Sequence, residues 1–340
     1  MIKHRKKSSV TAQDVALRAG VSRAAVSRTF TNNGSVAKHT REKVLQAANE
    51  LGYQVNFLAQ GLNRKRSQLI GVVVARLSDP FRSGLLEGLL LEIQRQGYQA
   101  MVTEVRNADG LEETIRRFTQ FRVSGVIVTS GQPPSELVNE CVQHNIPVVG
   151  INRQMDIKDV DFVCSDNKAG AALAAQQLLE SGCKQLAWLN YKDSTWGGIN
   201  RGECFKHAID QHQLQALELL AEQDGYQGGR QAAHQLCASQ NWNIDGVFCA
   251  NAQLACGFLD GMREQGFSAP QDFHLIGFDD TELTGQYSYQ LTTIRQNIDL
   301  IAKQAVLNLQ ARGRDNTAKQ RFDLVPVTLT LRATSPALTD

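Results

Sequence analysis

The residues best suited to chemistry are polar and aromatic side chains that lie just after the short β-branched runs predicted to be strands, or in the loops that follow them. Carboxylate, amide and guanidinium groups pair with hydroxyl groups, and aromatic faces cover apolar C–H surface. The set therefore predicts a site for a small hydroxyl-rich molecule such as a sugar. Its members are Asp79, Phe81, Ser130, Asn152, Arg153, Asp166, Trp196, Arg201, Tyr226, Asn251 and Asp279.

Some of these residues also have a simpler structural explanation, and the sequence leaves both open. Asp79 and Asp166 each precede a predicted helix, where a carboxylate is a good N-cap. Trp196 could equally belong to a hydrophobic core. Asp279 and Asp280 form the only Asp-Asp pair in the chain, and neighbouring side chains at a strand end point apart. The pair is therefore a poor candidate for acid/base catalysis.

Enzyme and metal motifs are absent from the sequence, which contains no G-x-G-x-x-G, P-loop, H-E-x-x-H or G-x-S-x-G. None of the seven cysteines forms a C-x-x-C pair. We expect them to be small buried residues in a reducing cytosol rather than disulfide or zinc ligands. The sequence thus predicts no enzyme, no metal site and no cofactor.

From residue 69 onward, short β-branched runs alternate with helical segments in two series, which predicts two sub-domains with parallel sheets covered by helices. In such sheets ligands bind beyond the carboxyl ends of the strands, so two facing sheets would form a cleft there. A final strand, helix and strand pair (291–296, 297–312 and 322–331) is expected to cross back. The predicted strands are 69–75, 98–105, 124–130, 146–151, 161–165, 186–190, 245–250 and 274–278, and the helices are 83–96, 111–121, 134–144, 167–181, 200–212, 228–239 and 251–265.

The segment VTAQDVALRAGVSRAAVSRTF, residues 10–30, predicts two short helices with a tight break. Thr11 and Asp14 form a capping box, Gly20 can end the first helix, and Ser22 can cap the second. This is a helix-turn-helix, whose second helix enters the DNA major groove. Its exposed residues would be Ser22, Arg23, Ala24, Ser27 and Arg28, and a third helix over 40–51 would bury Val44, Leu45, Ala48 and Leu51 before Gly52.

Charge is divided unevenly along the chain. Residues 1–66 hold 13 Lys and Arg against three acidic residues, a net charge of +10, whereas the remainder holds 23 against 31, a net charge of −8. A basic head on an acidic body indicates that the head alone meets a polyanion. The sequence has no long apolar run and no apolar segment behind its basic start, so neither a membrane span nor a signal peptide is expected.

The head continues as TREKVLQAANELGY and then QVNFLAQGLNRKRSQLIGVV. Together with the helix-turn-helix, these segments resemble the lactose/galactose repressor (LacI/GalR) family in register over nearly the whole chain. The resemblance implies DNA contacts from Thr11, Tyr53 and a hinge helix with Asn56 and Ala59. It also implies that Leu62 wedges into the minor groove at the centre of a palindromic site. Arg23 and Ala24 stand where the family reads base edges, although Arg23 could instead contact a phosphate.

The resemblance also reaches the body and shows three departures from the family pattern. It implies that Asn152, Arg201, Tyr226, Asn251 and Asp279 stand at effector-contacting positions, and that Asp79 and Phe81 match an N-P-F segment. The departures are Asp79 in place of Asn, Ala252 in place of Asp, and Ala37 in place of a Ser that caps the third helix. Loss of that cap would cost about 1 kcal/mol.

The expected fold is a small all-α helix-turn-helix head with a hinge helix, followed by an α/β body of two parallel-sheet sub-domains resembling periplasmic sugar-binding proteins. We predict a cytoplasmic transcriptional regulator, a repressor, that binds palindromic operator DNA as a homodimer under control of a sugar or sugar-derivative effector. A transport-type binding protein is the weaker alternative, because of the head. The predicted domains are 1–55 (DNA-binding), 56–68 (hinge and linker) and 69–340 (effector-binding and dimerisation), the last divided into about 69–165 plus 297–325 and about 166–296.

Overall fold

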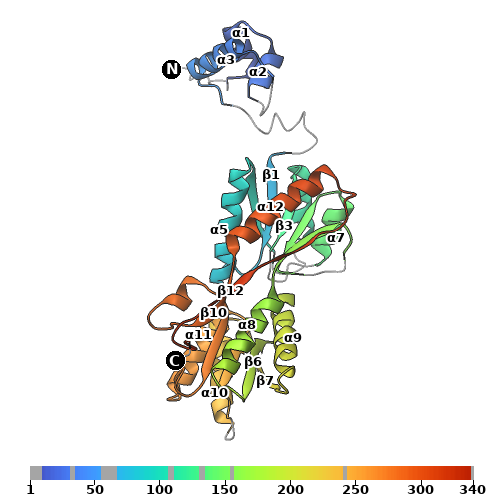
Figure 1. Cartoon of the computed structure of the whole chain (residues 1–340). Coiled ribbons are helices and arrows are strands. Elements are labelled where there is room, and N and C mark those ends of the chain that lie inside the picture. Colours follow the sequence, from blue (N-terminus) through green and yellow to red (C-terminus); the bar gives the residue numbers. More distant parts are fainter. Residues whose placement is uncertain are drawn as a thin grey trace, which may run out of the picture. The chain divides into compact units, whose positions relative to one another are not determined.

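The computed structural model divides into two compact units, Met1–Ser67 and Gln68–Asp340 (Figure 1). It describes residues 10–30, 35–54, 67–105, 111–129, 135–153, 157–239 and 243–337. The predicted hinge helix therefore lies outside the described residues, apart from residues 67 and 68. The predicted site residues Asn56, Ala59, Leu62 and Ser130 lie outside them as well.

The head is a three-helix unit, and its helix ends follow the sequence signals. Thr11 and Asp14 form the predicted capping box, Gly20 takes the left-handed conformation with φ 65°, and Ser22 Oγ accepts from the N–H of Ala25. Ala37 is the N-cap of the third helix and makes no side-chain capping bond, as its apolar side chain requires. The helices are α1 (Ala12–Ala19), α2 (Arg23–Thr29) and α3 (Lys38–Leu51).

The core of the head corrects one prediction. Leu45 is 46% exposed, whereas Ala47 is buried in its place beside Val44 and Ala48. Residues 44, 47, 48 and 51 follow the spacing of one helix face, and a residue one position away is rotated by about 100° from it. The remaining core residues are Val15, Ala16 and Val26, with Phe30 and Tyr53 packed at its edge.

The body contains two six-stranded sheets, which we assign to a first and a second sub-domain. The first sheet is entirely parallel, with the order β11-β5-β4-β3-β1-β2. One face packs on α5 and α12 and the other on α6 and α7. Its elements are β1 (Leu69–Val74), β2 (Gln99–Glu104), β3 (Gly125–Val128), β4 (Val148–Ile151), β5 (Val160–Ser165), β11 (Phe322–Val325), α5 (Pro80–Arg95), α6 (Leu111–Gln120), α7 (Ser135–Gln143) and α12 (Ile298–Arg314).

The second sheet has the order β12-β10-β9-β8-β6-β7 and is parallel except for β12, which runs antiparallel to β10. A single apolar cluster with Trp188 and five phenylalanines fills this sub-domain. Its elements are β6 (Leu186–Tyr191), β7 (Ala216–Ala221), β8 (Gly246–Cys249), β9 (His274–Asp279), β10 (Thr292–Gln296), β12 (Val327–Thr330), α8 (Asn167–Glu180), α9 (Trp196–Asp210), α10 (Tyr226–Ala238), α11 (Ala252–Glu264) and the 3-10 turn Glu282–Gly285.

Two features of the second sub-domain differ from the sequence prediction. Strand β7 was not predicted, because its sequence ALELLA consists of strong helix formers and its edge position leaves most of it exposed. Helix α9 begins at Trp196 and not near residue 200, since Thr195 Oγ1 caps it by accepting from Gly198 N–H. Trp196 is thus a helix residue rather than a loop residue.

The chain passes between the two sheets three times, after β5, after β10 and between β11 and β12, where Pro326 separates the two strands. These passages bring the carboxyl ends of both sheets to the junction of the sub-domains (Figure 1). All seven cysteines are free, five buried and two half-buried. Within the described ranges, every helix is too short or too polar to cross a membrane.

The missing cap of α3 generates a prediction. Replacing Ala37 with Ser should stabilise the head by about 1 kcal/mol, because the hydroxyl can accept an orphan N–H of the first turn. Hydrogen exchange of amides in residues 38–51 of the full chain should slow accordingly. Ser22→Ala, which removes an existing cap, is the control with opposite sign. Unchanged exchange in Ala37→Ser would contradict the assignment.

Candidate functional site

A small cavity of about 40 Å³ lies where the carboxyl ends of the two sheets meet. Its walls come from both sub-domains, and six of the residues predicted from strand ends line it. These six are Asp79, Phe81, Asn152, Arg201, Asn251 and Asp279, and the other lining residues are Arg82, Tyr191, Thr195, Gly197, Gly198 and Ala250. We call this space the cleft.

The simpler explanation of Asp79 holds together with its cleft position. Its Oδ1 accepts from the N–H groups of Phe81 at 2.9 Å and Arg82 at 3.2 Å, so it caps α5. Asn251 caps α11 in the same way, accepting from Leu254 N–H at 2.9 Å. Because α5 and α11 both begin at the cleft, the two capping side chains also lie at its wall.

Arg201 and Asp279 form a buried pair from the second sub-domain. Arg201 Nη1 lies 3.6 Å from Asp279 Oδ1 and donates to the Ala250 carbonyl at 2.6 Å. The guanidinium also stacks 3.6 Å above the Phe278 ring, and its Nε donates to Asn167 Oδ1 at 3.0 Å. Burial lowers the pKa of Arg201. These contacts fix the fork of Arg201 at the cleft wall.

A buried hydrogen-bond network joins the sub-domains beside this pair. Gln296 Oε1 accepts from Asn152 Nδ2 at 2.8 Å and from the Ser165 hydroxyl at 2.5 Å, while Gln296 Nε2 donates to Asp279 Oδ1 at 2.6 Å. Asn152 and Asp279 have left-handed backbones, with φ 48° and 96°, a region that Asn and Asp enter more readily than most residues. The network therefore orients two cleft residues from opposite sub-domains.

A second set of contacts crosses at the mouth of the cleft. Asp224, which lies between β7 and α10, places Oδ2 3.1 Å from Arg76 Nη1 and 3.5 Å from Arg82 Nη2. Its Oδ1 accepts from Asn251 Nδ2 at 2.9 Å. Arg82 and Arg76 belong to the first sub-domain and Asp224 to the second, so these ion pairs tie the two together.

The other predicted residues lie elsewhere among the described ranges. Asp166 caps α8 through Ala169 N–H, and Trp196 packs against the apolar cluster of the first sub-domain. The Tyr226 hydroxyl donates to Asp260 Oδ2 at 2.9 Å, and Tyr226 borders an adjoining cavity of about 390 Å³. Arg153 does not line the cleft, and burial lowers its pKa to about 10. The structure does not bring these four to the cleft.

Sequence reasoning missed Arg82, Asp224 and Gln296. Gln296 ends a predicted strand, so the rule that selected Asp279 could have found it. Asp224 follows β7. Because that strand was not predicted, its carboxyl end was not identified from the sequence. Arg82 directly follows Phe81, the last residue selected after the first strand, so the selection stopped one residue short of it.

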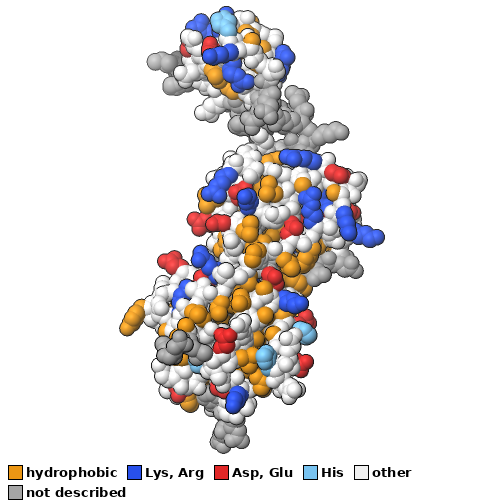
Figure 2. All heavy atoms as spheres, in the orientation of Figure 1, with side chains coloured by type: hydrophobic (Ala, Val, Ile, Leu, Met, Phe, Trp, Pro, Cys, Tyr) orange, Lys and Arg blue, Asp and Glu red, His pale blue; other side chains and the backbone are white. Residues whose placement is uncertain are grey.

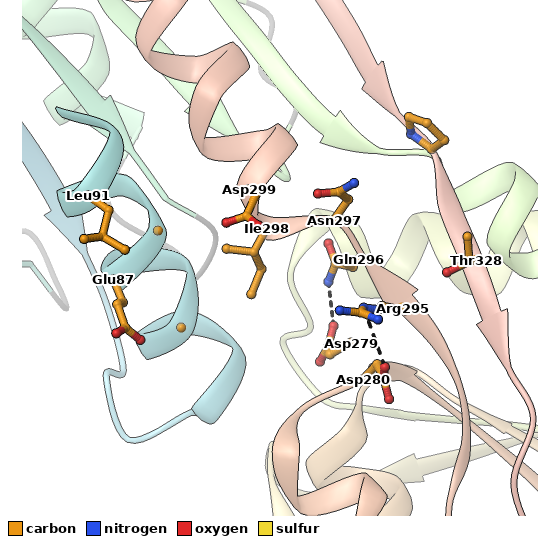
Figure 3. Close-up of a pocket in the computed structure, with 13 residues that line it drawn as sticks. Glu87, Leu91, Asp279, Asp280, Arg295, Gln296, Asn297, Ile298, Asp299 and Thr328 are labelled. Atoms are coloured by element: carbon orange, nitrogen blue, oxygen red, sulfur yellow. Dashed lines mark hydrogen bonds and ion pairs between the residues drawn. The ribbon is translucent and has the colours of Figure 1, made fainter. Parts of the chain in front are cut away.

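A wider cavity of about 680 Å³ lies between α5 and the start of α12 and shares Asp279 with the cleft. Figure 3 shows Glu87 and Leu91 on α5, with Ile298 at the start of α12 beside that helix. Asp280 and Asp299 also line this cavity, with Arg295 3.8 Å from Asp280. Within the described ranges, no three acidic, His or Cys side chains gather as a metal site.

In the head, the predicted DNA-contacting residues of α2 are all exposed: Ser22, Arg23, Ala24, Ser27 and Arg28. Arg28 Nε donates back to the Ala24 carbonyl at 3.3 Å. Thr11 is exposed within its capping box, and the half-buried Tyr53 ring packs on Phe30 with centroids 5.7 Å apart. Figure 2 shows Lys and Arg side chains on the visible surface of the head.

The buried carboxyl of Asp279 generates a pH prediction. Burial raises its pKa from 3.8 to about 6, although Arg201 beside it acts in the opposite direction. The folded state therefore holds this proton more tightly than the unfolded state. Between about pH 4 and pH 6 the free energy of unfolding should fall as pH rises, by no more than about 3 kcal/mol from this group. Denaturant unfolding of wild type and Asp279→Asn checks this, and equal slopes in both would contradict it.

Comparison with known proteins agrees with this architecture. The family model described as "Bacterial regulatory proteins, lacI family" matches residues 11–56, and the periplasmic binding protein-like domain matches residues 175–335. The ribose operon repressor of Halalkalibacterium halodurans is 31% identical over 330 residues, covering 96% of this chain and 97% of that protein.

Solved structures extend the likeness to the whole fold. A lac repressor dimer bound to operator and an anti-inducer superimposes with a TM-score of 0.83 at 27% identity, covering 97% of this chain and all of the other. A lacI-family transcriptional regulator from Enterococcus faecium with bound ribose gives 0.71 at 27% identity, over 80% of this chain and all of the other. The chain therefore belongs to the lacI family of bacterial regulatory proteins and is a DNA-binding transcriptional regulator.

Proposed function

We propose that this regulator is a cytoplasmic repressor that binds palindromic operator DNA as a homodimer and responds to a sugar or sugar derivative in the cleft. The observation that carries the proposal is that the cleft takes its polar side chains from both sub-domains. A molecule bound there contacts both, so its binding energy depends on their relative position. Differential affinity for two arrangements is what allows an effector to shift an equilibrium.

The domain roles follow from this division. Residues 1–55 bind DNA, residues 56–68 form the hinge, and residues 69–340 bind effector and dimerise. A dimer is needed because one short recognition helix makes few contacts, and a palindromic site matches a two-fold axis. The relatives support these roles: one solved lac repressor is a dimer on its operator, and another family member holds ribose.

The size of the cleft supports a change in the arrangement of the sub-domains. Its volume of about 40 Å³ is far below the roughly 300–1,000 Å³ of typical small-molecule pockets. A sugar that fills the cleft itself therefore requires the sub-domains to separate, which breaks the ion pairs of Asp224 with Arg76 and Arg82. Loss of those contacts is offset by contacts of the ligand with Arg201, Asp279 and Asn152.

A first prediction tests the effector role of Arg201. Arg201→Lys keeps the charge but loses the planar fork, so the affinity for effector should fall roughly 10- to 100-fold, as expected for lost charged hydrogen bonds. Operator affinity without effector should stay within about twofold, because the head is unchanged. Fluorescence anisotropy of labelled operator, titrated with a panel of sugars and sugar derivatives, measures both. Arg230→Lys, an exposed arginine paired with Glu264, is the control.

A second prediction tests the recognition helix. If Arg23 reads a base, Arg23→Ala should cost about 1–3 kcal/mol at one operator position and relax the preference there. An operator selected from a random palindromic library, with each position then varied, supplies the measurement. Arg18→Ala is the control, because Arg18 is an exposed arginine of the head that pairs with Glu50. A uniform loss across all sequences would reassign Arg23 to a phosphate contact.

A further inference from the structure

We propose that the effector carries an oxyanion, a carboxylate or a phosphate, which binds at the mouth of the cleft between Arg76, Arg82 and the N-terminus of α10. The inference rests on the proposed function and adds the chemical class of the ligand. The seat is the cavity of about 390 Å³, which continues into the cleft because Asp79 and Arg82 line both. Its other lining residues are Arg76, Ser78, Gln223, Asp224, Gly225, Tyr226 and Gln253.

The first support is Arg82, whose hydrogen-bonding capacity is incompletely used. Its side chain is only 8% exposed, with Nε 3.7 Å from Asp79 Oδ2 and Nη2 3.5 Å from Asp224 Oδ2. Among the described residues, no group accepts a hydrogen bond from its buried Nη1. Buried guanidinium N–H groups are normally satisfied, and the fork fits the two oxygens of a carboxylate or phosphate. A ligand oxyanion at this point would supply the acceptor.

The second support is that the two arginines already hold a carboxylate. Asp224 comes from the opposite sub-domain, and its Oδ2 lies within 3.5 Å of both guanidinium groups. Asp224 thus occupies the position that a ligand oxyanion would take. Its other oxygen accepts from Asn251 of the same sub-domain. Asp224 therefore keeps one hydrogen-bond partner when a ligand oxyanion binds the two arginines.

The third support is the start of α10 in the same cavity. Gly225 is its N-cap and provides no side-chain capping bond, and both Gly225 and Tyr226 line the cavity. The unpaired N–H groups of a helix N-terminus favour an anion. The helix therefore adds a positive end to the two arginines.

The charges of the seat determine how an anion binds. Arg76 and Arg82 are balanced by Asp79 and Asp224, so the lining carries no net charge. An incoming oxyanion must displace Asp224 from the arginines rather than join it, because like charges in one site repel. Binding of the oxyanion is therefore coupled to breakage of the ion pairs that join the sub-domains. A ligand of this class would change the arrangement of the sub-domains directly.

The test measures thermal stabilisation of the full chain by two oxyanion probes at constant ionic strength. Inorganic phosphate is compared with chloride, and gluconate with glucitol, which has a hydroxymethyl group where gluconate has its carboxylate. We expect at least one oxyanion to raise the melting temperature above its matched control. Stabilisation by phosphate alone identifies a phosphorylated effector, and stabilisation by gluconate alone identifies a sugar acid.

Variants attribute the effect to the seat. Asp224→Asn should strengthen oxyanion binding at least about threefold, because the competing charge is gone, and Arg82→Gln should weaken it about tenfold or more. If Arg82→Gln does not fold, the half-exposed Arg76→Gln should still weaken binding about threefold, as expected for an exposed ion pair. Arg295→Gln, which lines the wider cavity, should leave oxyanion binding unchanged.

The inference is overturned if neither oxyanion stabilises wild type or Asp224→Asn, or if the arginine variants bind as well as wild type. Operator binding measured on the same preparation separates this from the proposed function. If operator binding is intact and neither oxyanion binds, the proposal of an anionic effector is rejected and the proposed function as a regulator stands. Absent operator binding removes the proposed function, whatever the oxyanions do.

Discussion

The carboxamide of Gln296 is the interaction on which the arrangement of the body depends. It accepts from Asn152 and Ser165 in the first sub-domain and donates to Asp279 in the second. Ser165 and Gln296 are the last residues of β5 and β10, directly before two of the passages between the sheets. A fully satisfied buried network of this kind is rigid and specific, so it holds the carboxyl ends of the two sheets together where the chain crosses.

That fixed junction leaves the mouth of the cleft as the place where the sub-domains can part. Close to the network, Arg201 is held by Phe278, Ala250 and Asn167, all from its own sub-domain. Farther out, the ties are ion pairs between arginines of one sub-domain and Asp224 of the other. The pair of Asp224 with the half-exposed Arg76 contributes little net stability, whereas Arg82 and Asp224 are both largely buried. Opening at the mouth would break these ion pairs and leave the hydrogen bonds of Gln296 intact.

The sequence predicts the order of elements and most helix ends, because caps, glycines and β-branched runs are local signals. It predicts six of the cleft residues for a topological reason: parallel strands place their carboxyl ends at one edge. The failures have the same origin. Strand β7 was not predicted because it is an edge strand made of strong helix formers, and Asp224, which follows it, was missed with it. Leu45 was assigned to the buried face of α3, although it lies one position away from that face. The packing of Trp196 on the first sub-domain depends on a contact between sub-domains that no local pattern encodes.

The two kinds of cleft contact act on different parts of a ligand. The set of Arg201, Asp279 and Asn152 carries no net charge, because Arg201 and Asp279 compensate each other. These three side chains therefore suit the hydroxyl groups of a ligand. Among the described residues, Arg76 and Arg82 are compensated by Asp79, which caps α5, and by Asp224, which can leave. A neutral sugar would satisfy the inner set but would leave Arg76 and Arg82 without an anionic partner in place of Asp224. A ligand that also carries an oxyanion replaces Asp224 at the arginines, and so the same binding event fills the cleft and releases the tie that closes it.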